Sequence, residues 1–294
     1  MVDLRLTETD WHARRNAHLS RLLPFAEERT QRMAKGAAHP VRDFLFDYYS
    51  YRPAELLRWS PGADVLLEEA KPCDIAWKEF IATDDGLILP ASSFPEHRRA
   101  FLTWAINYFE AIRDRAPSFH CFGLHEWAMV YRAPEVRHAR TPLRLLPSEI
   151  AAVVEREGVR CTHYDAFRFF TREAIPLNRL SLTRQDTAEH DQKGCLHVAM
   201  DLYRYAHKIS PWCSGELIAD TFELAWDARA IDMRASPYDL REHGYEPIEI
   251  ETRDGREQYV ELQRDLSRRG EPLRERLIGE YQQLANINWC NLHE

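Results

Sequence analysis

The chain has 294 residues, 45% of them hydrophobic and 11% aromatic, which is enough for a sizeable core, and its formal net charge is −8. That charge argues against extended contact with nucleic acid, since phosphate neutralisation supplies most non-specific affinity, but the basic residues are mostly arginine and can still form a local basic groove. No run approaches about 20 apolar residues and no signal-peptide pattern opens the chain, so a cytoplasmic protein without a membrane partner is expected.

The first third of the chain predicts a helix followed by a small β element. Residues 7–35 carry apolar side chains at helical spacing, with Pro24 as a kink or break. Between residues 64 and 91 short apolar runs alternate with turn residues, and Asp85-Gly86 between two such runs predicts a β-hairpin.

The rest of the chain is predicted to be helical, without a composition shift that would mark a linker. Helical periodicity extends over residues 95–115, 148–157, 195–210 and 214–232, and over a C-terminal tail that Gly270 and Pro272 interrupt. The sequence therefore predicts one mainly α domain, residues 1–294, with the β element at about residues 64–91. It does not determine the oligomeric state.

Residues 195–210 are predicted to form the helix around which the chain folds. Two of its three faces are apolar or aromatic, while His197, Asp201 and Arg204 share the third face at spacings i, i+4 and i+7. A helix that is apolar over so wide an arc is central to a fold. Its polar stripe is therefore either its one solvated face, with ordinary surface pairing, or the wall of an internal pocket.

Residues 118–132 combine histidine and glutamate with aromatic rings. His125 and Glu126 lie close to Trp127 and Tyr131, and either polar side chain would press against apolar neighbours unless it has a partner. The zinc motif HExxH is incomplete, because residue 129 is methionine. The stretch is either a buried hydrogen-bonded pair or part of a site.

Residues 161–171 repeat this combination with a second histidine and a carboxylate. His163 and Asp165 lie beside Tyr164, Phe167 and Arg168. A pocket built from these rings is suited to a flat ring. The structural alternative is an aromatic core segment in which Asp165 pairs with Arg168.

The six cysteines contain no CxxC pair and are scattered along the chain, as expected of reduced thiols. Two of them form Cys-x-His steps, Cys161-Thr-His163 and Cys195-Leu-His197. That spacing is weak evidence for a metal.

Five segments carry these histidines and the neighbouring aromatic residues: HPVRDFLFDYY (39–49), HEWAMVYR (125–132), HYDAFRFF (163–170), GCLH (194–197) and MRASPYDL (233–240). Together they resemble a bacterial family that usually carries the name 3-methyladenine DNA glycosylase, and the resemblance extends over almost the whole chain. It implies a DNA-repair hydrolase that cleaves the N-glycosidic bond of alkylated adenine, with alkylated DNA as its partner and no cofactor.

Glycosylase chemistry needs aromatic faces around a flipped base, a carboxylate near the sugar, and cations on the flanking phosphates. A positively charged alkylated base is also a good leaving group and stacks well on aromatic rings. The candidate catalytic residues are Glu126, Asp165 and Asp201, and the candidate substrate-binding residues are Trp127, Tyr131, Tyr164, Phe167, Arg168, Arg204 and Tyr238.

A second interpretation is an enzyme that uses a transition metal or haem iron and acts on a small aromatic substrate. Its ligands are His125, His163 and His197, with His39 or His190 as possible additions. This interpretation agrees better with the acidic charge, and it predicts that the three imidazoles approach one another. A third is a non-catalytic ligand-binding or interaction protein in which the same residues are buried structural pairs.

Overall fold

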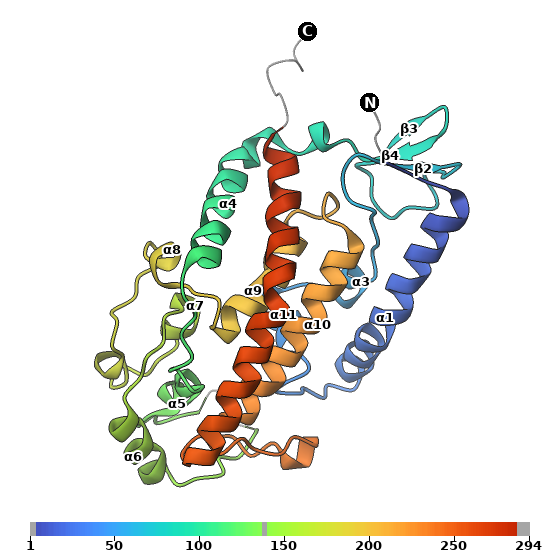
Figure 1. Cartoon of the computed structure of the whole chain (residues 1–294). Coiled ribbons are helices and arrows are strands. Elements are labelled where there is room, and N and C mark those ends of the chain that lie inside the picture. Colours follow the sequence, from blue (N-terminus) through green and yellow to red (C-terminus); the bar gives the residue numbers. More distant parts are fainter. Residues whose placement is uncertain (1–3, 137–139, 287–294) are drawn as a thin grey trace.

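The molecule is mainly α-helical, with a small four-stranded sheet at one end (Figure 1). The computed structural model describes residues 4–136 and 140–286. Over these residues the helices are α1 (Glu8–Ala34), α2 (Phe44–Tyr49), α3 (Pro53–Leu56), α4 (Arg99–Asp114), α5 (Leu124–Val130), α6 (Pro147–Glu157), α7 (Tyr164–Phe167), α8 (Thr187–His190), α9 (Leu196–Lys208), α10 (Gly215–Arg234) and α11 (Arg253–Ala285). The strands are β1 (Leu4–Leu6), β2 (Val65–Glu68), β3 (Ile81–Thr83) and β4 (Gly86–Ile88).

The predicted hairpin is confirmed, because β3 and β4 pair in antiparallel fashion around the Asp85-Gly86 turn. The strand order is β1-β2-β4-β3, and β2 pairs with β4 in antiparallel fashion. The N-terminal strand β1 pairs in parallel with β2, and this strand was not predicted. Its three residues have too short a pattern to indicate a strand, and its partner lies some 60 residues away in the chain.

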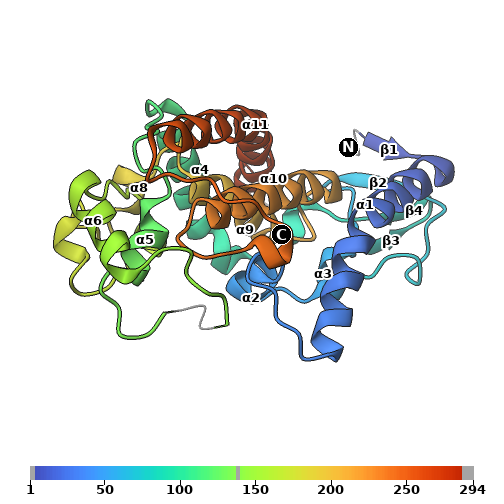
Figure 2. The same cartoon turned by 90° about the horizontal axis from the view of Figure 1, so that it is seen from below.

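Helix α9 is the central element, as predicted. It packs against α10 on one side and α11 on another, and Figure 2 shows it enclosed near the middle of the molecule. Asp201 on its polar stripe is only 5% exposed. His197 and Arg204 of the same stripe are half-buried and line clefts, so the stripe is a cleft wall and not an ordinary solvated face.

Both long helices continue through their prolines. Pro24 lies inside α1, and α11 passes through Gly270 and Pro272 without interruption, so the predicted break in the C-terminal tail is wrong. A Cβ built at Gly270 would lie 3.5 Å from Leu224 of α10 and 3.6 Å from Leu202 of α9. These are ordinary van der Waals distances, so α11 packs against both neighbours here, and this packing keeps the helix intact across the missing proline hydrogen bond.

Among the described residues, no helix is both long enough and apolar enough to cross a membrane.

Two glycines of α11, one in its first turn and one near its end, test how tightly the first turn packs against the preceding segment. A Cβ on Gly255 would lie 2.0 Å from the backbone oxygen of Glu249, whereas nothing lies within 4 Å of a Cβ on Gly279. We expect Gly255→Ala to lower the free energy of unfolding by at least about 1–3 kcal/mol, as overpacking does. Gly279→Ala should raise it by roughly 0.4–1 kcal/mol, because alanine is the better helix former.

Denaturant unfolding of the two variants measures both effects. If Gly255→Ala and Gly279→Ala changed the free energy of unfolding equally, the close approach of residues 249 and 255 would be contradicted.

Candidate active site

Three histidines from separate parts of the chain meet in the interior. The ring centroids of His125 on α5 and His197 on α9 are 4.5 Å apart, and those of His197 and His163 are 5.1 Å apart. The predicted approach of these imidazoles is confirmed.

The His125 ring is held at both nitrogens. Its Nε2 lies 2.6 Å from Oδ1 of Asp232 on α10, and its Nδ1 lies 3.4 Å from the Cys121 sulfur. Burial favours the neutral ring, but the nearby Asp232 and Cys121 outweigh it and raise the pKa of His125 well above its usual range. The pKa of Asp232 is held low despite complete burial, because His125 is its close partner.

A buried arginine completes this group of charges. Arg229 is 2% exposed and donates from one nitrogen, at 2.8 Å, to both Glu126 and Asp232. Its guanidinium carbon also lies 3.9 Å from the centroid of the Phe44 ring. Arg229 therefore fixes the carboxylates of Glu126 and Asp232 relative to each other and to the Phe44 ring.

His163 sits between two further carboxylates. Its Nε2 lies 3.4 Å from Asp201 and 4.0 Å from Asp191. Burial lowers the pKa of His163, but Asp191 and Asp201 outweigh this effect and raise it to about 9. Burial raises the pKa of Asp191 to about 6. The tyrosines Tyr108 and Tyr49 donate to Asp191 and Asp201 at 2.7 and 3.0 Å.

His197 differs from the other two histidines. Burial, followed by the positive charge of His125, lowers the pKa of His197 well below its usual range, so its ring is neutral. Within the described part of the chain, no hydrogen bond occupies its nitrogens. Its ring is half-buried and is part of the wall of a large cleft. The neutral ring is therefore free to accept a proton or bind a ligand.

The large cleft, which we call the aromatic cleft, has a volume of about 820 Å³. Its apolar walls come from Phe44, Tyr48, Met129 and Phe169, and its polar groups include Glu126, His197, Arg229, Asp165 and Arg168. Its size falls within the range of small-molecule sites.

A second cleft of about 440 Å³ lies beside it, and we call it the arginine cleft. Four cations and four tyrosines line it with a single carboxylate: Arg168, Arg184, Arg204, Lys208, Tyr48, Tyr49, Tyr51, Tyr164 and Asp165. Burial and the adjacent Arg204 lower the pKa of Lys208. The excess of positive charge favours an anion here.

The two clefts share three residues, Tyr48, Asp165 and Arg168. Asp165 accepts hydrogen bonds from Arg204 at 3.1 Å and pairs with Arg168 at 3.2 Å. Asp201 lies behind this wall and contacts the same Arg204 at 3.5 Å. The structure thus places Asp165 at the junction, with Asp201 as its inner support.

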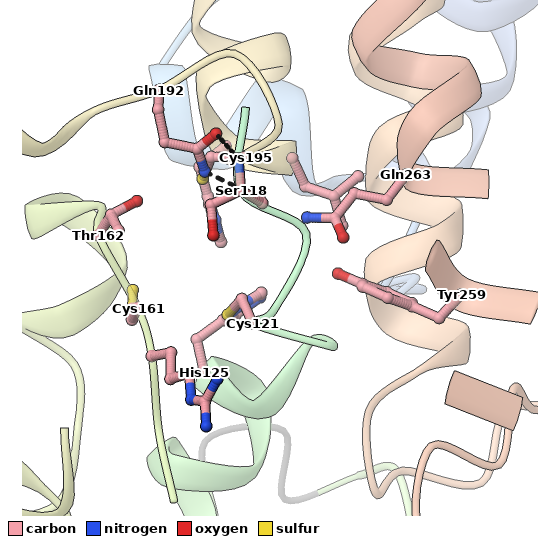
Figure 3. Close-up of a pocket in the computed structure, with 12 residues that line it drawn as sticks. Ser118, Cys121, His125, Cys161, Thr162, Gln192, Cys195, Tyr259 and Gln263 are labelled. Atoms are coloured by element: carbon pink, nitrogen blue, oxygen red, sulfur yellow. Dashed lines mark hydrogen bonds between the residues drawn. The ribbon is translucent and has the colours of Figure 1, made fainter. Parts of the chain in front are cut away.

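A small cavity of about 10 Å³, roughly the space of one water molecule, is lined by His125 and His197 (Figure 3). Cys121, Cys161 and Cys195 reach it from three separate segments, and Tyr259 and Gln263 reach it from α11. The five cysteines of the described residues are free thiols, as predicted.

The structure brings together only part of the predicted site. Glu126, Asp165, Arg168, Tyr164 and Arg204 line the two clefts. Four predicted substrate-binding residues, Trp127, Tyr131, Phe167 and Tyr238, are instead buried in the core at 0–7% exposure.

The placement of these four residues corrects the prediction, because side chains packed in the core have no face toward a cleft. The Trp127 indole donates to the backbone oxygen of Ala235, and the Tyr131 hydroxyl donates to Glu155. His39 lines the aromatic cleft beside His243, their ring centroids 4.7 Å apart. In the described residues, neither His39 nor His190 belongs to the group that could hold a metal.

Sequence reasoning missed Asp191, Arg229 and Asp232. The last two lie on α10, which was predicted as an ordinary amphipathic helix. Phe222 and Ala225 share a face with both charged residues at spacings i, i+3, i+7 and i+10, and all four are buried. The signal in the sequence was an arginine and an aspartate on the apolar face of a helix, because charged side chains at buried positions need charged partners.

No family model, curated protein or solved structure matches this chain. The resemblance to 3-methyladenine DNA glycosylases therefore stays a prediction.

Arg229 gives a direct test of the buried network. Arg229→Met keeps most of the side-chain volume but leaves Glu126 and Asp232 without their shared donor. We expect the free energy of unfolding to fall by about 3–5 kcal/mol, as for other buried ion pairs that lose one partner. Arg269→Met, which removes an arginine paired with Asp227 at the surface, should change it by only about 0–1 kcal/mol.

Thermal or denaturant unfolding of both variants measures these two changes in the free energy of unfolding. A loss below about 1 kcal/mol in Arg229→Met would show that the two carboxylates do not depend on this arginine.

Proposed function

We propose that the protein is a hydrolase that cleaves the N-glycosidic bond of an alkylated adenine nucleotide, with alkylated DNA as its substrate. The observation that carries this proposal is the junction of the two clefts at Asp165. A nucleotide has a flat base and an anionic phosphate on opposite sides of its sugar. If the base lies in the aromatic cleft and the phosphate in the arginine cleft, the sugar between them would lie beside Asp165, which lines both clefts.

The walls of the aromatic cleft support binding of a cationic ring. Alkylation gives adenine a positive charge, and such a ring is attracted to the faces of aromatic side chains. Phe44, Tyr48 and Phe169 supply those faces, and Glu126 supplies a negative charge in the same cleft. The volume of about 820 Å³ leaves room for a base together with water.

The arginine cleft supports binding of the flanking phosphate. Arg184 and Lys208 form no ion pair with a carboxylate anywhere in the described ranges, so their charges are available to a ligand. An acidic protein that holds a few cations in one groove can contact DNA locally while binding undamaged DNA weakly.

Asp165 is suited to the chemical step. As the glycosidic bond breaks, its electron pair moves to the base nitrogen and positive charge develops on the sugar. A carboxylate beside the sugar stabilises that charge and accepts a proton from the water whose oxygen bonds to the anomeric carbon. Asp201 acts as a positioning residue, because it holds Arg204 and His163 behind Asp165.

A second candidate function is a metal-dependent enzyme that acts on a small aromatic molecule. The observation that favours it is the group formed by His125, His197 and Asp232, whose potential ligand atoms lie within 4.8 Å of one another. His163, which the sequence suggested as a ligand, is not part of this group.

Asp165→Asn tests the proposed function. The substitution keeps the shape of the side chain and removes its charge, so excision of 3-methyladenine from alkylated DNA should fall about 10²-fold or more. The melting temperature should change little, since the Asp165 side chain is 26% exposed and its ion pairs are partly solvated. Asp227→Asn, which alters another aspartate paired with an arginine but lies outside both clefts, is the matched control and should excise as the wild type does.

Two outcomes would contradict the proposal. Equal excision by Asp165→Asn and wild type would remove Asp165 from the reaction, and no excision by the wild type would reject the glycosylase function itself. Asp201→Asn should lower both activity and melting temperature, because Asp201 is buried and has His163 as its partner.

A further inference from the structure

Three buried or half-buried side chains, one of which lines the aromatic cleft, have the composition of a metal site. They are His125 on α5, His197 on α9 and Asp232 on α10, and one ligand atom from each lies within 4.8 Å of the other two. Two imidazoles and one carboxylate are a common ligand set for catalytic zinc and for non-haem iron, and both leave coordination positions open. We propose that His125, His197 and Asp232 bind one divalent transition-metal ion.

The three ligands come from three helices that pack into one core. Helices α9 and α10 pack directly against each other, and His125 and Asp232 are 2% and 0% exposed. Rigid helices hold ligand atoms more closely in place than loops do. The site is therefore formed before any ion binds.

Partners outside the ligand group orient two of the ligands. Nδ1 of His125 lies 3.4 Å from the Cys121 sulfur, so Nε2 is directed toward Asp232. Oδ2 of Asp232 accepts from Arg229 at 2.8 Å, and Oδ1 faces Nε2 of His125 at 2.6 Å, so an ion bound by these two atoms replaces the proton that they share. Metal sites in proteins use outer partners of this kind to fix the tautomer and direction of their ligands.

The third ligand connects the site to the cleft. Among the described residues, His197 has no hydrogen-bond partner, and its ring lines the aromatic cleft. An ion bound to it is accessible to a water molecule or a substrate atom. In the same interior, Nδ1 of His163 and Oδ1 of Asp191 are buried without a hydrogen-bond partner in the described chain, as happens where an ion or water belongs.

His163 and the cysteines lie next to the site but outside it. Nε2 of His163 is turned toward Asp201 and Asp191. Cys121 contacts the first ligand from behind, in the small cavity of Figure 3. The proposed ligand set therefore differs from the three histidines that the sequence suggested. It concerns metal binding alone and holds whether or not the substrate is alkylated DNA.

The test is the metal content of the full chain, purified without a chelator or a histidine tag and measured by inductively coupled plasma mass spectrometry. The metal-free protein is then titrated with Zn²⁺, Fe²⁺, Mn²⁺ and Co²⁺. Binding is followed by the melting temperature and, for Co²⁺, by visible absorption. We expect one ion per chain and a higher melting temperature with the preferred ion, since an ion that binds only the folded state stabilises it.

Three variants locate the site. His197→Gln should lose the ion but keep the fold, because this side chain makes no hydrogen bond within the described residues. His163→Gln should keep the ion, which separates the proposed ligand set from a three-histidine set. His207→Gln is the matched control on the same helix, since its ring stacks on Tyr51 and lies outside the group.

The expected result is about a tenfold or greater loss of bound metal in His197→Gln, with wild-type metal content in the other two variants. Wild-type protein that neither carries an ion nor responds to any of the four would overturn the proposal. So would equal binding by wild type and His197→Gln, which would place the ion elsewhere. Neither result depends on DNA excision, so the metal site and the proposed reaction fail separately.

Discussion

The arrangement of the site depends on charges that are buried together. Arg229 donates hydrogen bonds to both Glu126 and Asp232, and Asp232 also pairs with His125. Each of these groups costs several kcal/mol to bury alone, so each needs its partner in place. The network therefore fixes α5 and α10 relative to each other and sets the inner end of the aromatic cleft.

A second chain of buried contacts forms around His163. Asp191 and Asp201 flank its ring, and Tyr108 and Tyr49 donate to these two carboxylates. His197 lies between the two networks and takes no hydrogen bond from either among the described residues. Its neutral ring can therefore accept a proton or bind a ligand without breaking either network.

The proposed reaction and the proposed metal site use different parts of the same cleft. Asp165 lies near the surface, where the aromatic and arginine clefts meet, and His197 lies deeper. The arginine cleft is the part of this acidic chain to which the proposed reaction assigns the phosphate. Four cations gather there although the chain as a whole carries a charge of −8.

The sequence alone determined most of the helices and the hairpin, because hydrophobic periodicity and turn residues are local signals. It also indicated α9 as the central helix, since two of its faces are apolar, and it suggested that His125, His163 and His197 meet. The break expected at Gly270 and Pro272 was wrong, because packing of α11 on α9 and α10 outweighs local propensity.

Only the tertiary structure decided which residues the clefts expose. The sequence predicted that the rings of Trp127 and Tyr131 bind a substrate. Packing decides which way these side chains point, and both are core residues. Asp232 contacts His125, and its carboxylate lies within 4.8 Å of a His197 nitrogen, although 107 residues separate Asp232 from His125 in the chain. No local pattern encodes such a contact, because it depends on how α5, α9 and α10 pack.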